Sequence, residues 1–478
     1  MASIDVSLKA AANTVLADET IAEFRAAMRG EVLTPQSAHY DEVRQIWNGL
    51  MHDRHPAIIA RCTGVADVVT ALNFARENDL LLAVRGGGHN VAGSASCEGG
   101  IMIDLSLMKG VHVDPQARTA RVQGGATWGD VDRETQVFGL AAPGGVVSTT
   151  GVAGLTLGGG LGHLRRKYGL TIDNLISVEL VTAAGQVLTA SESQNADLFW
   201  GIRGGGGNFG IVTSFEFRLH PVGPMVTLCS PWYPVEDAAR LLREWRDYMK
   251  TTPEEFTCNA IFWTVPPAPD FPEELHFKRF LAFAGVHCGP VEEGARVIQP
   301  LRELGTPLAD LSGPLPWVAV QQAFDPFFPK AQRRYYFKSR LLKELDDATL
   351  DAVAQRAIQP PSPFVLVVLW TYSGAMQRVK DTQTAFMGRQ AGCLLSIDGV
   401  WDDPTDGDKV IAYARSFLSE MEPYAYGGLY VNFAGFGEEG EDLVKDAYGS
   451  HYARLVALKN KYDPTNLFRL NQNIKPGA

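Results

Sequence analysis

Residues 84–93 of the chain read Val-Arg-Gly-Gly-Gly-His-Asn-Val-Ala-Gly. An apolar run at residues 80–84 leads into this segment, and a second apolar run follows at residues 101–103. Three successive glycines allow positive φ angles and let the backbone approach a ligand closely. Free N–H groups in such a turn form a hollow that suits a phosphate, and His89 adds an imidazole to it. The pattern indicates either a phosphate-binding loop with a reactive side chain or an ordinary tight turn, because short glycine motifs are weakly specific.

Residues 143–169 form a second glycine-rich region, in which nine of 27 residues are glycine. This density is too high for the interior of a helix or a strand. The region also carries apolar residues that a disordered linker would lack: Val146, Val147, Val152, Leu155 and Leu157. We therefore expect a folded, glycine-rich wall that lies against a flat ligand.

Composition excludes several classes of protein. With 478 residues the chain is long enough for two or three domains, and 46% hydrophobic and 20% charged residues are typical of a globular protein. The net charge of −11 argues against nucleic acid or an anionic membrane as the main partner. The six cysteines are scattered without metal-ligand spacing, so no metal site is expected. The first 24 residues have no apolar stretch typical of a signal peptide, and no segment is apolar enough to span a membrane, which favours a cytoplasmic location.

The clearest boundary in the chain is His220-Pro-Val-Gly-Pro224. Residues 1–50 are expected to be helical and peripheral, and residues 226–428 to alternate strands with helices. Aromatic residues are frequent in this second part, where we expect about two-thirds to be core and the rest to line a substrate cavity. They are Trp232, Trp263, Trp317, Phe324, Tyr335, Tyr336, Trp370, Tyr372 and Trp401.

Five ordered motifs resemble the berberine-bridge-enzyme-like branch of the vanillyl-alcohol-oxidase flavoprotein superfamily. They are Arg85-Gly-Gly-Gly-His-Asn90, Gly124-Gly-Ala-x-Trp-Gly-Asp130, Pro143 to Gly169, Asp197-Leu-Phe-Trp-Gly-Ile-Arg-Gly204 with Asn208-Phe-Gly-Ile-Val-Thr213, and Tyr462-Asp-Pro-Thr-Asn-Leu-Phe468. The resemblance implies an α+β fold with a two-part FAD-binding domain of the PCMH type. Residues 1–224 and the C-terminal segment 429–478 would form this domain. Residues 225–428 would form a substrate-binding domain, an antiparallel sheet covered by helices.

The resemblance also assigns residues to the cofactor. His89 would bond covalently to the 8α-methyl carbon of the flavin, and Arg85, Gly86, Gly87, Gly88 and Asn90 would cradle the pyrophosphate. The second glycine region would run along the flavin through Pro143, Gly144, Gly145, Val147, Gly151, Gly154, Gly158, Gly159 and Gly162. Ile211 and Val212 would lie near the adenine, and Asn471 and Asn473 would contact the cofactor from the C-terminal segment. A covalent imidazolyl substituent withdraws electrons and makes the flavin a stronger oxidant.

The chain departs from the family pattern at two positions. Val147 stands where members with a doubly attached flavin have a cysteine, so we expect a single covalent bond, through His89. Phe433 stands where many members have a tyrosine that acts as catalytic base. Asp402, Tyr430 and Tyr372 are the candidate substitutes, although Asp402 lies in a segment that is equally consistent with a solvated turn.

These features favour an FAD-dependent oxidase that takes hydride from a CH–OH group of a small organic substrate, such as a sugar or phenolic compound, and reduces O₂ to H₂O₂. Oxidation of a C–N bond in an amine or alkaloid is the alternative, because a neutral amine needs no base. A flavin dehydrogenase with another electron acceptor and a flavoprotein without turnover also stay open. The expected partners are the small-molecule substrate and O₂, and the sequence does not define an oligomeric state.

Overall fold

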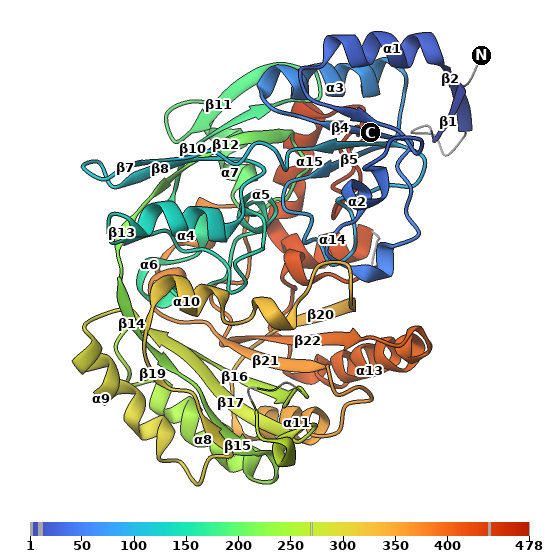
Figure 1. Cartoon of the computed structure of the whole chain (residues 1–478). Coiled ribbons are helices and arrows are strands. Elements are labelled where there is room, and N and C mark those ends of the chain that lie inside the picture. Colours follow the sequence, from blue (N-terminus) through green and yellow to red (C-terminus); the bar gives the residue numbers. More distant parts are fainter. Residues whose placement is uncertain (1–2, 8–12, 268, 270, 438–440, 478) are drawn as a thin grey trace.

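The computed structural model describes residues 3–7, 13–267, 269, 271–437 and 441–477. The chain forms two halves that lie one above the other (Figure 1). Two sheets and the C-terminal helices make the upper half of this view, and one large sheet with its helices makes the lower half. The expected α+β class with antiparallel sheets is confirmed. Among the described residues, no helix has the length and apolar character needed to cross a bilayer.

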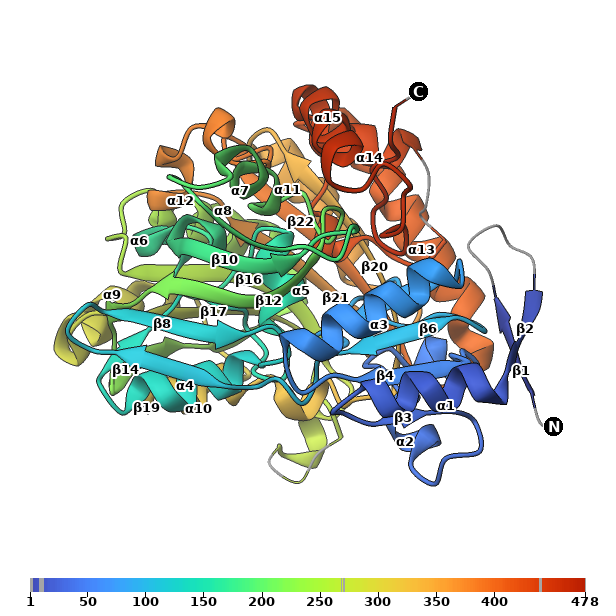
Figure 2. The same ribbon diagram turned by 90° about the horizontal axis from the view of Figure 1, so that it is seen from above.

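The loop at residues 86–90 follows a small, mostly parallel sheet. Its order is β3 (Val32–Leu33), β4 (Ile58–Arg61), β6 (Ile101–Asp104) and β5 (Leu82–Arg85). The predicted apolar runs form β5 and β6, which pair in parallel and are almost wholly buried. Helix α3 (Val65–Glu77) packs on β6 through its apolar stripe, with α1 (Asp18–Ala27) beside it (Figure 2). Burial on both faces explains why these strands are continuous apolar runs.

The prediction that residues 1–50 are helical is only partly correct. A hairpin of β1 (Ser3–Ser7) and β2 (Asn13–Ala17) precedes α1, and β3 adds an antiparallel edge strand to the small sheet. The only other α-helix among the described residues of this segment is the short α2 (Tyr40–Arg44). The apolar spacing that predicted a helix is real, since Ile21 and Phe24 are buried on α1, but it extends over ten residues rather than fifty.

A five-stranded antiparallel sheet completes the first half. Its central strand is β12 (Ile211–Arg218), on which Phe215 and Phe217 are fully buried. Helices α4 (Trp128–Gln136) and α7 (Ala196–Ile202) pack beside the sheet. The strand order is β11 (Val187–Ser191), β10 (Leu175–Val181), β12 (Ile211–Arg218), β8 (Thr119–Gln123) and β7 (Val111–Asp114).

The second half is a nine-stranded sheet whose described strand pairs are all antiparallel. Helices α8 (Ala238–Met249), α9 (Val291–Arg302), α11 (Asp347–Ala357) and α13 (Gly407–Glu420) cover its lower face in Figure 1. The opposite face turns towards the first half. The strands are β14 (Met225–Cys229), β15 (Pro231–Pro234), β16 (Phe256–Thr264), β17 (Arg279–His287), β18 (Ala309–Asp310), β19 (Gly313–Pro316), β20 (Arg334–Leu342), β21 (Leu366–Thr371) and β22 (Cys393–Trp401).

The C-terminal segment returns to the first half through α14 (Glu441–Tyr448) and α15 (Tyr452–Tyr462). A fully buried ion pair between Lys459 and Asp463, 2.8 Å apart, anchors this return. The Lys459 ammonium also donates to the carbonyl oxygen of Asn208 in the first half. Because a buried charge is tolerated only when it is paired and hydrogen-bonded, these contacts fix the position of the segment. We retain 224/225 and 428/429 as proposed domain boundaries.

Candidate active site

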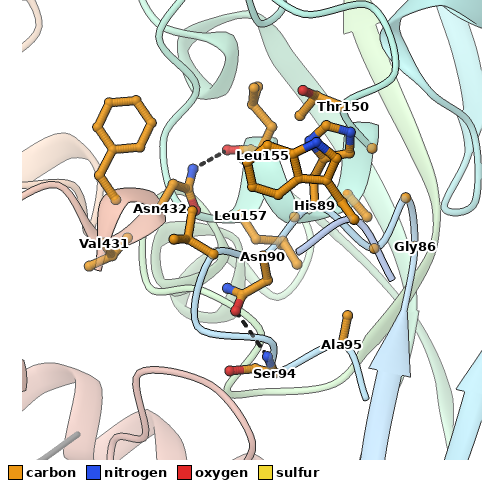
Figure 3. A pocket seen from close by; sticks show the side chains of 18 of the residues that line it. Gly86, His89, Asn90, Ser94, Ala95, Thr150, Leu155, Leu157, Val431 and Asn432 are labelled. Carbon is orange, nitrogen blue, oxygen red and sulfur yellow. Dashed lines mark hydrogen bonds between the residues drawn. The ribbon is translucent and has the colours of Figure 1, made fainter. Parts of the chain in front are cut away.

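A cavity of about 330 Å³ lies where the loops of the first half meet the uncovered face of the nine-stranded sheet. Its volume is in the range of small-molecule sites. Its lining includes glycine-rich loops, strand residues of the large sheet, and two stretches near the C-terminus: residues 430–433, and Phe468 with residues 470–472. Figure 3 shows His89 and Asn90 of the first glycine loop near Leu155 of the second glycine region, whose carbonyl oxygen accepts a hydrogen bond from the Asn432 amide.

The glycine loop that follows β5 lines the cavity with Gly86, Gly87 and Gly88. Gly88 has a φ of +72°, a conformation in which a residue with a side chain would be strained. A Cβ atom at Gly87 would lie 2.4 Å from the Cα atom of Gly151, and one at Gly151 would lie equally close to the nitrogen of Gly87. The two glycine regions thus pack backbone against backbone, and the next residue of the loop, Asn90, also lines the cavity.

Arg85 does not take the position that the sequence predicted. It is the last residue of β5 and pairs with Asp104, the last residue of β6. Its Nε donates to the Asp104 carboxylate over 2.8 Å, and its side chain is absent from the described lining of the cavity. Although burial opposes it, the Arg85 guanidinium holds the pKa of Asp104 below its ordinary value. Arg85 therefore stabilises the ends of the two strands that carry the loop, rather than facing the cavity.

His89 lines the cavity and is held by two neighbours. Its Nε2 lies 2.9 Å from the hydroxyl oxygen of Thr149, and its ring stacks on Trp47 with 4.8 Å between the ring centroids. Burial, with a smaller contribution from the positive charge of Lys330, lowers the pKa of His89 to about 3. The imidazole is therefore neutral at physiological pH, and one of its nitrogens carries a free lone pair.

Some residues of the second glycine region line the cavity, and others pack against protein atoms. The sequence predicted only the first group. Val147, Gly151 and Gly154 line the cavity. Other glycines pack against protein atoms, because a Cβ atom at Gly159 would lie 2.6 Å from the ring of Phe386. Six of the residues predicted to lie along the flavin are outside the described cavity lining. They are Pro143, Gly144, Gly145, Gly158, Gly159 and Gly162.

The remaining predicted cofactor residues are also divided between those that line the cavity and those that lie outside the described lining. Ile211 and Val212, at the start of β12, line the cavity, and so does Asn471. The Asn471 amide nitrogen donates to the carbonyl oxygen of Gly207 over 3.1 Å, whereas its Oδ1 is buried without a protein partner. Asn473 is outside the described lining, and its Oδ1 also lacks a partner.

The opposite wall of the cavity is the uncovered face of the nine-stranded sheet. Alternate residues along each strand point to this face. Most of them are apolar, and the loop before β20 adds two phenylalanines, Phe324 and Phe328. The apolar strand residues are Ile261, Ala284, Phe337, Leu366, Val368 and Trp370, and the polar ones are Asn259 and Asp398. Phe324 and Trp370 are thus the two of the nine predicted aromatics that line the cavity.

Asp398 carries the one carboxyl group among the described residues that line the cavity. It lies in the middle of β22, and its register partners on the two adjoining strands are Leu366 and Phe337. Its side chain is buried, and Oδ1 accepts no hydrogen bond from the described protein. Burial, opposed only by a hydrogen bond with Ser396, raises the pKa of Asp398 to about 7. Such a carboxyl group can bind or release a proton at neutral pH.

The structure places Asp402, one of the candidate catalytic bases, in a solvated position, which is the alternative that the sequence left open. Asp402 follows the end of β22, its side chain is half exposed, and it pairs with Arg333 over 3.2 Å, away from the cavity lining. Tyr372 is buried, its hydroxyl group has no partner among the residues that the structure describes, and it too is outside the lining. Of the three predicted catalytic residues, Tyr430 alone lines the cavity.

The Tyr430 hydroxyl accepts hydrogen bonds from the backbone N–H of Gly160, over 3.1 Å, and from the Asn432 amide, over 2.9 Å. Burial outweighs these donors and raises the pKa of Tyr430 above its ordinary value. The hydroxyl is therefore neutral at pH 7 and anchors the loop of the second glycine region. Phe433 lines the same part of the cavity and packs edge-on against Tyr430.

Comparisons with known proteins agree with this geometry. Residues 56–191 match the FAD binding domain family, and residues 429–475 match the berberine and berberine-like family. An FAD-linked oxidoreductase of Dictyostelium discoideum is 32% identical over 465 residues, which cover 96% of this chain and 98% of that protein. The chain belongs to the berberine-bridge-enzyme-like family of FAD-linked oxidoreductases.

Two further comparisons converge on one kind of relative. The (R)-6-hydroxynicotine oxidase of Paenarthrobacter nicotinovorans is 31% identical, with 94% of this chain and 97% of that protein aligned. The crystal structure of 6-hydroxy-D-nicotine oxidase from Arthrobacter nicotinovorans superposes with a TM-score of 0.83 at 29% identity, covering 94% and 98% of the two chains. Berberine bridge enzyme from Eschscholzia californica shares the fold, with a TM-score of 0.83.

The cavity of this berberine-bridge-enzyme-like protein fits its family's cofactor. Gly154 and Gly207 both line it, and a Cβ atom at either would meet no protein atom within 4 Å, so the missing side chains leave space along the wall. The unpartnered Oδ1 of Asn471 is a free acceptor on the same side. FAD would be held by the loop at residues 86–90, by Gly154, Gly207 and Val212, and by the C-terminal residues that line the cavity.

Sequence reasoning missed two side chains of this family member's site, Trp47 and Asp398. An aspartate in the middle of an apolar strand is a usable signal, because buried charges are rare without a partner or a function. Trp47 gave no such signal. It lies in a segment that was expected to be peripheral, and its contacts with His89 and Tyr335 connect residues far apart in the sequence.

Proposed function

We propose that this FAD-linked oxidoreductase is an oxidase that takes hydride from a CH–OH group of a small, largely apolar substrate and transfers the electrons to O₂, giving H₂O₂. Bound FAD supplies the two-electron acceptor for this chemistry. The substrate would lie between the glycine loops and the face of the nine-stranded sheet. The observation that carries the proposal is Asp398, a buried carboxyl group with a free acceptor oxygen in an apolar wall.

Asp398 is proposed as the base that removes the hydroxyl proton. A base is most effective when its pKa is near the working pH, and burial raises the pKa of Asp398 to about 7. The register places Leu366 and Phe337 on either side of it, so little water competes for the carboxylate. Phe433, which replaces the tyrosine expected from the family resemblance, cannot take this role.

The surroundings of Asp398 favour a ring-bearing or otherwise apolar alcohol over a sugar. A sugar presents many hydroxyl groups, each of which needs a partner when it is buried. The sheet face around Asp398 offers mainly hydrocarbon, from Ile261, Val368 and Trp370. A phenolic or similar compound would bury its apolar surface there and place one polar group at Asp398.

Single attachment of FAD through His89 is the second part of the proposal. The neutral imidazole of His89 is a competent nucleophile, and Val147 lines the cavity where a second attachment would need a thiol. Digestion of the purified protein should give one flavin-bearing peptide, the one that contains His89. A second modified peptide, or FAD that is released completely by acid, would contradict this part.

Amine oxidation is the second candidate, and the 31% identity to (R)-6-hydroxynicotine oxidase favours it. In this case Asp398 would pair with, or deprotonate, a substrate ammonium group. A panel of alcohols and amines, mixed with the protein without O₂, separates the two: the true substrate bleaches the flavin absorption band. Admission of air should then produce one equivalent of H₂O₂. Bleaching by amines alone would replace the alcohol proposal, and slow return of colour in air would indicate a dehydrogenase.

A further inference from the structure

His89 is fixed in the cavity wall by contacts with two residues that have no assigned role. Thr149 lies 2.9 Å from the Nε2 atom of His89, and Trp47 stacks on the imidazole with 17° between the ring planes. We propose that Thr149 is a positioning residue that prepares His89 for its bond to FAD, by setting which imidazole nitrogen carries the proton and by leading that proton away. This inference rests on the covalent attachment proposed above.

The hydrogen bond that one imidazole nitrogen makes determines which nitrogen holds the proton in the neutral ring. When Nε2–H donates to the Thr149 hydroxyl oxygen, Nδ1 is left with the lone pair. A neutral ring is the state that the site favours, because burial lowers the pKa of His89 to about 3. Thr149 thereby selects Nδ1 as the nucleophile, in the same way that outer groups orient metal-bound histidines.

The bond-forming step balances with this arrangement. Nδ1 forms a bond to the 8α carbon, which loses one hydrogen, and the imidazole loses the proton on Nε2. The electron pair of the broken C–H bond would remain on the flavin ring with the proton from that bond and one proton taken up from solvent, and O₂ would then accept two electrons and two protons to give H₂O₂. The proton on Nε2 leaves through the hydrogen bond to Thr149, which is exposed to solvent.

Both neighbours of His89 are themselves held in place. The residue before Thr149, Ser148, donates from its backbone nitrogen to the Asp325 carboxylate over 2.9 Å. Trp47 stacks on Tyr335 with 3.7 Å between ring centroids, and its indole nitrogen donates to the carbonyl oxygen of Phe328 over 3.0 Å. Thr149 and Trp47 are therefore rigid supports, which is what precise orientation of a reacting group requires.

The test compares Thr149→Val, which keeps the shape and removes the hydroxyl group, with Thr149→Ser, which restores it. Thr189→Val is the matched control, because Thr189 is an exposed threonine of β11 that lies outside the described cavity lining. Each full-length protein is purified and incubated with excess FAD in air. Intact mass gives the covalently loaded fraction over time, and absorbance gives the total FAD bound.

We expect Thr149→Val to bind FAD normally but to form the bond about tenfold more slowly, the rate equivalent of one hydrogen bond. Thr149→Ser and Thr189→Val should load at nearly the wild-type rate. Wild-type loading by Thr149→Val, or an equal loss in Thr189→Val, would overturn the role of Thr149. A wild-type protein without covalent FAD would instead overturn the attachment itself, so the two failures are distinguishable.

Discussion

The two walls of the cavity are built in different ways. The glycine-loop wall is made largely of backbone: at Gly87 and Gly151 the chains approach so closely that a Cβ atom at either would lie within 2.4 Å of the other. The sheet wall is made of side chains, which come from alternate positions on β16, β20, β21 and β22. A cofactor that is bound by backbone constrains the identity of residues that are contiguous in the sequence. A substrate that is bound by a sheet face constrains the identity of single residues on separate strands. The first wall should therefore tolerate few substitutions, and the second should tolerate many except at Asp398.

The largest effect is expected at His89. Replacement by alanine removes the proposed nucleophile, so the covalently bound fraction of FAD should fall from nearly complete to none, as measured by intact mass. The glycine loops remain, so the variant should still bind FAD reversibly. Its flavin should be a weaker oxidant, because the electron-withdrawing substituent is lost. Residual covalent FAD in His89→Ala would show that another residue of the backbone wall makes the bond.

On the sheet wall, Asp398→Asn should reduce kcat for an alcohol substrate by roughly 10²-fold or more, the usual contribution of a general base. In the wild type, activity should rise with pH through about 7, because the carboxyl group must be deprotonated to act. Val368→Ala, on the neighbouring strand, is the control and should alter KM more than kcat. If Asp398→Asn retains wild-type kcat with an alcohol, the base lies elsewhere.

The backbone wall can be tested at Gly154, where a side chain would point into open space along the cavity. Gly154→Leu should weaken FAD binding by about tenfold, because the side chain occupies space meant for the cofactor. Gly64→Leu is the control, since a Cβ atom there also meets nothing within 4 Å but lies outside the cavity lining. Unchanged FAD affinity in Gly154→Leu would mean that the cofactor does not lie along this part of the wall.

The smallest effect concerns stability and pH. Folding raises the pKa of Asp398 from 3.8 to about 7, so the native state binds a proton that the unfolded state releases between these values. The stability of the wild type should therefore decline as pH rises from 4 to 7, by a few kcal/mol at most. Asp398→Asn should lack this decline, so its Tm should match the wild type near pH 4 and exceed it increasingly up to about pH 8. Parallel Tm curves would contradict the raised pKa.

The same contrast explains what the sequence could predict. The five ordered motifs, with the glycine segments at residues 84–93 and 143–169 among them, predicted the family, the cofactor and the α+β fold through their resemblance, because backbone binding leaves contiguous patterns. Asp398 and Asp402 are four residues apart, and the resemblance favoured Asp402, which lies outside the described cavity lining. Only the strand register decides that Asp398 faces the cavity and that Asp402 lies beyond the strand end, beside Arg333.

Other differences also arise from contacts between distant parts of the chain. Arg85 is the first residue of a cofactor motif, but the parallel pairing of β5 with β6 brings Asp104 beside it. The negative charge of Asp104 at this buried strand end attracts the Arg85 guanidinium. Gly159 resembles its cavity-lining neighbours in sequence, yet it makes room for Phe386, more than 200 residues later. No local pattern encodes such partners.

The return of the C-terminal segment has a consequence for biosynthesis. Asn471 and Gln472 line the same cavity as Asn90, yet a ribosome makes them about 380 residues later. At roughly 5–20 residues per second, the interval is on the order of a minute or less. Throughout that interval the nascent chain has its glycine loops but lacks Asn471 and Gln472, which complete the cavity lining. Loading with FAD must therefore be an event after translation, and a prematurely terminated chain would remain colourless.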